Sequence, residues 1–507
     1  MLFNSYVFIG TFLPVTLLVY ALLGRFAVDR AAQIWLTAAS FFFYGWWNPA
    51  HLPLLFGSCT ANFLVGRSLA DATMPSATRR GLLWLGVAGN LALLGYFKYS
   101  IFVLDNVSAL TGLDFALRAI VLPLGISFFT FQQIAYLADA SNGDAGDYDF
   151  IDYCLFVAFF PQLIAGPIVH HGEMMGQFKR PIRERLDAQA FAMGVTYFAI
   201  GLFKKVVIAD NISGIADASF AASSAAGGLS GVDAWRGILA YTLQLYFDFS
   251  GYSDMAIGLA LMFGIRLPFN FNSPYKAASI SDFWRCWHMT LSRFLRDYLY
   301  VPLGGNRRGG ARRYANLVIT MVLGGLWHGA GWTFLIWGAL HGAYLMVNHA
   351  WRALRERLGL TRSFGPAGLW AGRIVTLLCV MVAWVFFRAP GVEAASNMLS
   401  AMVGLNGWIG PEDPLARFYG PAPEGGPIRL LRHVVGAFDT EILLGFLLAI
   451  VWLAPNSQEI VDGVGAQTRR LSLRWQPTPA WAGCVSVVLL FAVSQMSKVS
   501  AFLYFQF

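Results

Sequence analysis

The chain has 507 residues, of which 57% are hydrophobic and only 13% are charged, and its net charge is +8. So few charged side chains cannot cover the surface of a soluble protein of this size, and the composition therefore excludes a soluble protein. Charge-free runs of membrane-spanning length recur along the chain, which predicts a polytopic membrane protein. The five cysteines are scattered and form no CxxC pair, which excludes a disulfide framework. The excess of Lys and Arg fits cytoplasmic loops near anionic lipid better than a nucleic-acid surface.

The apolar runs predict an all-α fold with about 11 or 12 membrane-spanning helices. The first run, Met1–Gly24, lacks the basic start and small-residue cleavage site of a signal peptide, so we expect a retained helix. Residues 31–66 are long enough for two short passes, with Trp46–Ala50 as the turn between them. Residues 98–118 fit either an interfacial helix or part of a crossing. Further spans are expected at 82–97, 119–138, 153–169, 188–209, 233–262, 374–390, 438–455 and 478–497.

The charges of the loops set the orientation of the chain. Residues 139–152 carry five Asp and no Lys or Arg, whereas residues 266–313 carry nine basic residues. The positive-inside rule therefore places 266–313 in the cytoplasm and 139–152 outside. The same parity makes 391–437 an external loop, followed by C-terminal helices in 438–507. We expect a single integral membrane domain over 1–507.

Residues 314–351 form the longest informative run, because 38 residues without Asp, Glu, Lys or Arg lie between two basic clusters. Two short spans satisfy the charge rule, and the glycine-rich segment 324–331 is the place for the reversal. Irregular backbone at membrane depth is tolerated where it is buried in protein or lines a cavity, so His328 is expected to face a cavity. Its neutral imidazole, with a reference pKa of about 6.5, is suited to take a proton from a hydroxyl. A hydrogen bond across helices explains the same placement.

His288 is the second histidine in a suggestive context. On a helix, Trp284, Trp287 and His288 share one face with Leu291, so we expect one amphipathic helix lying in the membrane interface. Arginines on such a helix are also typical of binding to lipid phosphates, and this alternative stays open.

Polar residues also interrupt the span at 244–254. Asp248 and Asp254 are six residues apart, about 240° around a helix, so they are not expected to form a carboxylate pair. With Ser250 they indicate a structural hydrogen-bond network rather than a substrate pathway. The chain has no GxxxxGK[ST], HExxH or GxSxG motif, and we expect no metal.

Several of these segments together resemble the membrane-bound O-acyltransferase family, and within it the branch of the bacterial alginate O-acetyltransferases. The segments are DFWRCWH at 282–288, RDYLYVPLGG at 296–305 and GLWHGAGWT at 325–333, supported by matches at 123–128, 161–167 and 246–254. The likeness extends over residues 1–390. Cys286 departs from the pattern, because a second basic residue is expected there.

The resemblance implies a central funnel with short interfacial or re-entrant helices, in which His328 is catalytic and His288 is the second functional histidine. It implies acyl transfer from cytoplasmic acetyl-CoA to hydroxyls of an exported or cell-envelope polysaccharide, across a bacterial inner membrane. It further implies no permanently bound cofactor and a periplasmic SGNH-like acetyltransferase partner. D-alanyl or lipid O-acyl transfer on the same fold is the alternative, and a transporter or flippase is the rival class.

The remaining candidates follow from these expectations. An oxyanion donor is required, and the Trp327 or Trp332 indole N–H or a glycine backbone N–H is suited to that role. The candidates for lining the funnel are Trp327, Trp332, Asp248, Ser250, Asp254, Trp284 and Trp287. The candidates for binding the CoA phosphates are Arg285, Arg293, Arg296, Arg307 and Arg308.

Overall fold

The computed structural model describes residues 1–113, 120–144, 148–225, 227–307, 309–360, 365–410, 438–463, 473–496 and 502–503. Every regular element in these ranges is a helix, which confirms the all-α prediction. The chain divides into two compact units. Unit 1 comprises 1–206, 249–270 and 457–507, and unit 2 comprises 207–248 and 271–456. Two helices contribute residues to both units, namely η4 (Phe203–Ala209) and α13 (Gly231–Met262).

Four continuous helices in the described ranges are long and apolar enough to cross a membrane, namely Phe8–Arg25, Ser76–Thr111, Ala188–Ala222 and Gly365–Arg388. The protein is therefore a multi-pass membrane protein, while the number of 11 or 12 spans stays a prediction. Residues 98–111 are continuous with the helix Ser76–Thr111, and the choice between an interfacial segment and part of a crossing stays open. Residues 114–119 lie outside the described residues, as does 411–437 within the expected external loop.

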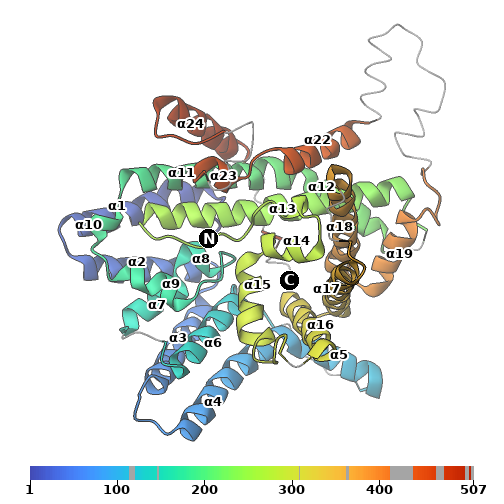
Figure 1. The fold of residues 1–507 in the computed structure, drawn as a ribbon. Helices are drawn as coiled ribbons and strands as arrows, with labels where there is room; N and C mark the ends of the chain where they lie inside the picture. Colours follow the sequence, from blue (N-terminus) through green and yellow to red (C-terminus); the bar gives the residue numbers. More distant parts are fainter. Residues whose placement is uncertain are drawn as a thin grey trace. The chain divides into compact units, whose positions relative to one another are not determined.

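Unit 1 is built from short and medium helices. In it α6 packs against α3 and α4 (Figure 1), α2 packs against α1 and α7, and α11 packs against α24. The described helices are η1 (Phe8–Phe12), α1 (Leu13–Arg25), α2 (Asp29–Gly45), η2 (Pro49–His51), α3 (Leu52–Leu69), α4 (Ser76–Leu94), η3 (Gly95–Tyr99), α5 (Ser100–Thr111), α6 (Ile126–Ser141), α7 (Phe150–Ala158), α8 (Phe160–Leu163), α9 (His171–Phe178), α10 (Ile182–Arg185), α11 (Ala188–Leu202), α23 (Ser457–Val461) and α24 (Pro479–Ser494).

Two expectations for unit 1 have opposite outcomes. The turn between α2 and α3 falls at Trp46–His51, so the two helices and the turn predicted for 31–66 are confirmed, while their crossing of the membrane stays a prediction. The single span predicted for 153–169 is wrong, because α7 ends at Ala158 and α8 is only four residues long. Phe159 has φ −49° and ψ 108°, outside the helical range, and Pro161 in the first turn of α8 cannot donate a hydrogen bond back to α7.

The predicted placement of 139–152 and 266–313 on opposite sides of the membrane is also wrong, because the short helix α9 contacts both segments. Its His171 lies 3.1 Å from Asp139, and its Gln177 donates to the Arg266 carbonyl at 2.9 Å.

Glycines bring α11 and α13 together within unit 1. A Cβ atom added to Gly194 of α11 would lie 2.6 Å from the carbonyl oxygen of Gly258 in α13. Seven residues further on, Gly201 faces Gly251 in the same way. Small residues at membrane-helix contacts let backbones approach closely, so this spacing fixes the position of α13 against α11.

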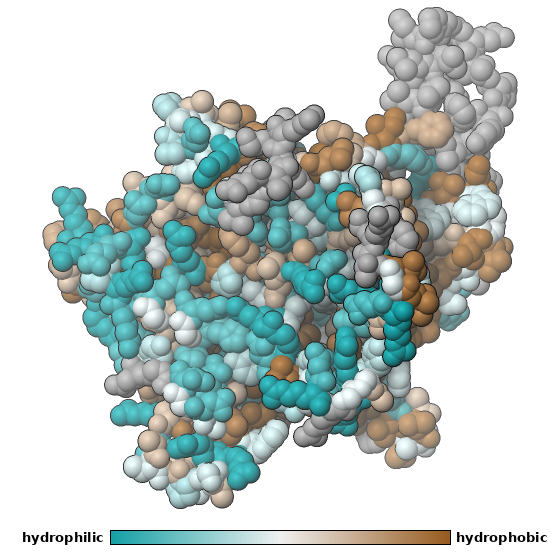
Figure 2. Space-filling view, viewed as in Figure 1, coloured by the Kyte–Doolittle hydropathy of each residue, from teal (hydrophilic) through white to brown (hydrophobic). Residues whose placement is uncertain are grey.

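Unit 2 holds the segments that resemble family motifs around His288 and His328. Its described helices are α12 (Asp210–Ala222), η5 (Pro274–Lys276), α14 (Ile280–Cys286), α15 (Met289–Leu295), η6 (Arg296–Tyr300), α16 (Gly309–His328), α17 (Trp332–Arg357), α18 (Gly365–Arg388), α19 (Val392–Met402) and α22 (Asp439–Leu453). Hydrophobic side chains gather at the surface over α19 and α22 (Figure 2), among them Val392, Ile442 and Phe446. Apolar surface of this kind is what a lipid-facing helix presents.

Candidate active site

The close packing of α16 on α17 positions His328. A Cβ atom on Gly338 would lie 2.8 Å from the Cα atom of Val322, and one on Gly342 would lie 3.0 Å from the Cα atom of Val318. His328 is the last residue of α16, and α17 begins at Trp332 after a three-residue turn. The predicted reversal is confirmed, although α16 continues helically through Gly324 and Gly325.

The segment that carries His288 differs from the prediction. The single amphipathic helix expected around Trp284–Leu291 is wrong, because α14 ends at Cys286 and α15 begins only at Met289. Trp287 is extended, with φ −103° and ψ 127°, and His288 is left-handed, with φ 42° and ψ 53°. A left-handed non-glycine residue costs about 1–2 kcal/mol and is retained where surrounding structure enforces it, often at functional sites.

This break places His288 beside His328. The two imidazole ring centroids lie 6.4 Å apart, and Trp327 packs edge-on against both rings at 6.1 and 4.9 Å. His288 is 0% exposed and His328 is 4% exposed. Trp337 and Phe387 close the other side of His328, with centroid distances of 5.0 and 5.1 Å. Two buried imidazoles in an aromatic enclosure form a water-poor centre suited to proton transfer.

The other two predicted tryptophans of the segment belong to the same aromatic cluster. Trp287 is buried and packs on Trp384 at 5.1 Å. Trp284 packs edge-on against Trp337, with the ring centroids 5.9 Å apart, and its indole N–H donates to Nδ1 of His341 at 3.3 Å.

His341 was not among the predicted site residues. It is 0% exposed and lies 4.8 Å from Trp337, centroid to centroid. Trp337 and His341 are four residues apart and so share a face of α17, which is the signal that would have found this residue.

The remaining funnel candidates differ in their exposure and in their partners. Trp332 is 57% exposed at the start of α17. Asp254 and Ser250 are buried in unit 1, where Lys204 Nζ donates to Asp254 Oδ2 at 2.6 Å and Ser457 Oγ donates to Oδ1 at 2.9 Å. This arrangement is the structural network expected for Asp254. Asp248 is buried in the part of α13 that belongs to unit 2.

Two of the predicted phosphate-binding arginines form ion pairs with a neighbouring aspartate, and the others differ in exposure. Arg285 pairs with Asp282 at 2.8 Å and Arg296 pairs with Asp297 at 2.7 Å, so a neighbouring acid neutralises each. Arg293 is half-buried at the end of α15, Arg307 is exposed, and Arg308 lies outside the described residues.

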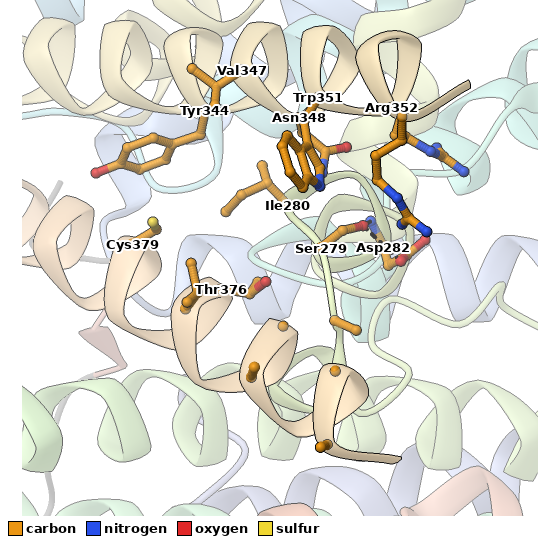
Figure 3. A pocket seen from close by; sticks show the side chains of 17 residues that line it. Ser279, Ile280, Asp282, Tyr344, Val347, Asn348, Trp351, Arg352, Thr376 and Cys379 are labelled. Atoms are coloured by element: carbon orange, nitrogen blue, oxygen red, sulfur yellow. Dashed lines mark hydrogen bonds between the residues drawn. The ribbon is translucent and has the colours of Figure 1, made fainter. Parts of the chain in front are cut away.

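A pocket of about 950 Å³ opens between α14, α17 and α18 in unit 2. Figure 3 shows Tyr344, Asn348, Trp351 and Arg352 projecting into it from α17, opposite Thr376 and Cys379 of α18. Arg355 also lines it. The inner wall continues toward the buried cluster, because the Tyr344 ring lies 5.8 Å from that of His341. The pocket therefore combines aromatic rings and two arginines, and its Tyr344 wall contacts the buried cluster.

Among the described residues, no group of three or more His, Cys, Asp or Glu side chains is arranged to hold a metal ion. Residues 91–387, which span both histidines, match the membrane-bound O-acyltransferase family. The chain belongs to this family. It is accordingly a membrane-bound O-acyltransferase, and family membership favours acyl transfer over the transporter reading.

Relatives within the family share much of the chain. It is 48% identical to a peptidoglycan O-acetyltransferase of Helicobacter pylori, over 80% of each chain. It is 39% identical to a probable alginate O-acetylase AlgI of Pseudomonas aeruginosa, over the full length of both. A teichoic acid D-alanyltransferase of Streptococcus thermophilus is 27% identical over 52% of this chain and 68% of its own.

Proposed function

We propose that the protein transfers acetyl groups from acetyl-CoA, taken up on the cytoplasmic side of a bacterial inner membrane, to hydroxyl groups of an exported or cell-envelope polysaccharide. The transfer proceeds directly or through a periplasmic SGNH-like partner. The observation that carries the proposal is the buried pair of His328, at the end of α16, and His288, in the break between α14 and α15, which meet in one aromatic enclosure.

His328 acts as the general base in this proposal. It accepts the proton of the attacking hydroxyl while the hydroxyl oxygen bonds to the thioester carbonyl carbon. Collapse of the tetrahedral intermediate breaks the carbon–sulfur bond, and His328 returns the proton to the leaving thiolate. His288 supplies a second imidazole to hold the reacting groups in the same enclosure. Burial favours transfer, because it keeps water from hydrolysing the thioester.

The pocket between α14, α17 and α18 supports a nucleotide-bearing donor. Arginine side chains bind phosphates through charge-assisted hydrogen bonds, and Trp351 offers a face on which an adenine can stack. The loop-charge rule places the neighbouring residues 351–373 in the cytoplasm, where CoA is available. We assign Arg352 and Arg355 to the donor phosphates, in addition to the arginines expected from the sequence.

The acceptor class follows from the named relatives. Peptidoglycan and alginate are both carbohydrates with free hydroxyl groups, and both names describe O-acetyl transfer. The D-alanyl alternative has weaker support, since that relative is 27% identical over about half of the chain.

The experiment uses purified protein in nanodiscs with radiolabelled acetyl-CoA and, in parallel, a D-alanyl carrier-protein thioester. Soluble alginate or peptidoglycan fragments serve as acceptors, with and without a periplasmic acetyltransferase partner. We expect thiol release and acetyl ester formation with acetyl-CoA only. Transfer from the D-alanyl thioester instead would overturn the choice of donor. His328→Ala should lose this turnover, and His349→Ala is its matched control, because His349 lies on α17 two turns beyond His341 and is expected to keep wild-type turnover.

A further inference from the structure

Two buried donors on one face of α17 lack acceptors. Among the described residues, neither Nε1 of Trp337 nor Nε2 of His341 has a hydrogen-bond partner, although Trp337 is 1% exposed and His341 is 0% exposed. An unsatisfied buried polar group costs stability, so native proteins retain few of them and often use those they keep. Two such groups on one helix face, four residues apart, indicate a shared acceptor.

The tautomer of His341 follows from its one hydrogen bond. The Trp284 indole can only donate, and it donates to Nδ1 of His341 at 3.3 Å. Nδ1 therefore carries no proton, which excludes both the charged imidazolium and the Nδ1–H tautomer. The single ring proton lies on Nε2, and this nitrogen is a hydrogen-bond donor.

Trp337 links this donor to the proposed base. Its ring centroid lies 4.8 Å from that of His341 and 5.0 Å from that of His328, and it meets the His328 ring edge-on at 84°. Trp337 thus contacts both the proposed base and the histidine that carries the second unsatisfied N–H group. The chemistry that needs two converging donors beside a general base is the stabilisation of an oxyanion.

We propose that the Trp337 indole N–H and the His341 Nε2–H bind the carbonyl oxygen of the donor thioester and stabilise it as an oxyanion. This inference rests on the proposed function and assigns the oxyanion donors to residues other than Trp327 and Trp332. When the hydroxyl oxygen bonds to the carbonyl carbon, the π electrons of the C=O bond move to this oxygen, and the hydroxyl proton goes to His328. When the C=O bond re-forms, the carbon–sulfur bond breaks, and the thiolate takes the proton.

The test compares kcat and KM for acetyl-CoA in Trp337→Phe, His341→Phe and His341→Gln, each checked for folding. Removal of one oxyanion donor lowers kcat by about 10²–10³-fold, with KM expected within about threefold. His341→Gln restores part of the activity, because its amide can accept from Trp284 and donate to the oxyanion. Phe283→Leu is the packing control. The Phe283 ring stacks on His341 at 7° and 6.2 Å but has no N–H group, so kcat should fall only a few-fold.

A donor analogue separates oxygen binding from packing. Replacing the thioester carbonyl oxygen by sulfur weakens the hydrogen bonds that this atom accepts. The wild type should therefore turn over acetyl-CoA faster than the sulfur analogue, and the ratio of the two rates should be smaller in Trp337→Phe. An unchanged kcat in both Trp337→Phe and His341→Phe overturns the inference alone, provided that the wild type turns over acetyl-CoA. A loss of kcat with an unchanged preference overturns it too, since the residues would then act through packing. A wild type that releases no thiol overturns the proposed function, and the inference with it.

Discussion

His288 and His328 face each other across the aromatic cluster with their ring planes inclined at 60° and their centroids 6.4 Å apart. One imidazole is presented by a break between two seven-residue helices, and the other by the last residue of a twenty-residue helix. The pair therefore depends on two local backbone features, and each can be altered separately.

The left-handed backbone at His288 gives a prediction that separates stability from activity. We expect both His288→Gly and His288→Ala to lose at least about a hundredfold in turnover, because both remove the imidazole. Glycine adopts φ 42° without strain, whereas alanine pays about 1–2 kcal/mol, so the glycine variant should melt at the higher temperature. Thermal unfolding in detergent measures this, and a more stable alanine variant would contradict the assigned conformation.

The contact between α16 and α17 predicts that Gly338→Ala destabilises the protein. The added methyl group would meet the backbone of Met321 and Val322, and forcing atoms into a packed contact costs about 1–3 kcal/mol. Turnover should fall with it, because the end of α16 carries His328. Gly331→Ala is the control, since its added Cβ atom would make only an ordinary contact of 3.6 Å with Phe334. Equal melting temperatures for the two variants would refute the close packing.

The buried ion pair of Lys204 and Asp254 predicts non-additive stability. Lys204→Met leaves the Asp254 carboxylate buried without its cation, which costs about 3–5 kcal/mol. The double variant Lys204→Met/Asp254→Leu should recover much of this loss, because no charge is then left unpaired. The four melting temperatures of a double-mutant cycle measure the coupling. Additive effects would mean that the pair is not a stabilising unit.

His171 predicts a pH dependence of stability. Burial lowers its pKa, but the Asp139 carboxylate, 3.1 Å from Nδ1, and the Asp144 carbonyl, 3.2 Å from Nε2, raise it by more, so the net shift is upward. The unfolded pKa is about 6.5, so the stabilisation is fully present below about pH 6.5 and is lost as the pH rises through the raised folded pKa. His171→Gln should therefore lower the melting temperature most near about pH 6. A gap to wild type that widens at alkaline pH would contradict this.

The pocket of Figure 3 predicts a donor-binding phenotype. Arg352→Ala should raise the KM for acetyl-CoA by about tenfold or more with little change in kcat, because a charge-assisted hydrogen bond contributes about 1.5–3 kcal/mol. Arg357→Ala is the matched control, as Arg357 ends the same helix, is exposed and does not line the pocket. An equal KM in both variants would remove Arg352 from the donor site.

The sequence predicted the reversal between α16 and α17 because its cause is local. Basic clusters at both ends of a charge-free run require two passes, and glycines mark where the chain can turn. The same reasoning located Trp46–Ala50. Charge and breakers act over a few residues, so a single sequence displays them.

The features that escaped prediction depend on distant partners. No glycine or proline marks the break at Trp287 and His288, and a helical period runs through it, so the surrounding aromatic cluster decides the backbone there. Spacing correctly separated Asp248 from Asp254, but the cation for Asp254 comes from Lys204, fifty residues earlier. The spacing of Trp337 and His341 marks a shared face of α17, but the hydrogen bond from Trp284 to His341 joins two helices and is not visible in the sequence.

The most direct test is single-turnover release of free CoA thiol from acetyl-CoA by the wild type and by His328→Ala, with size exclusion confirming that both are folded. We expect the wild type to release thiol in the presence of a polysaccharide acceptor and the folded His328→Ala variant to be slower by at least about a hundredfold. A folded His328→Ala variant that releases thiol at the wild-type rate would contradict the assignment of His328 as the base.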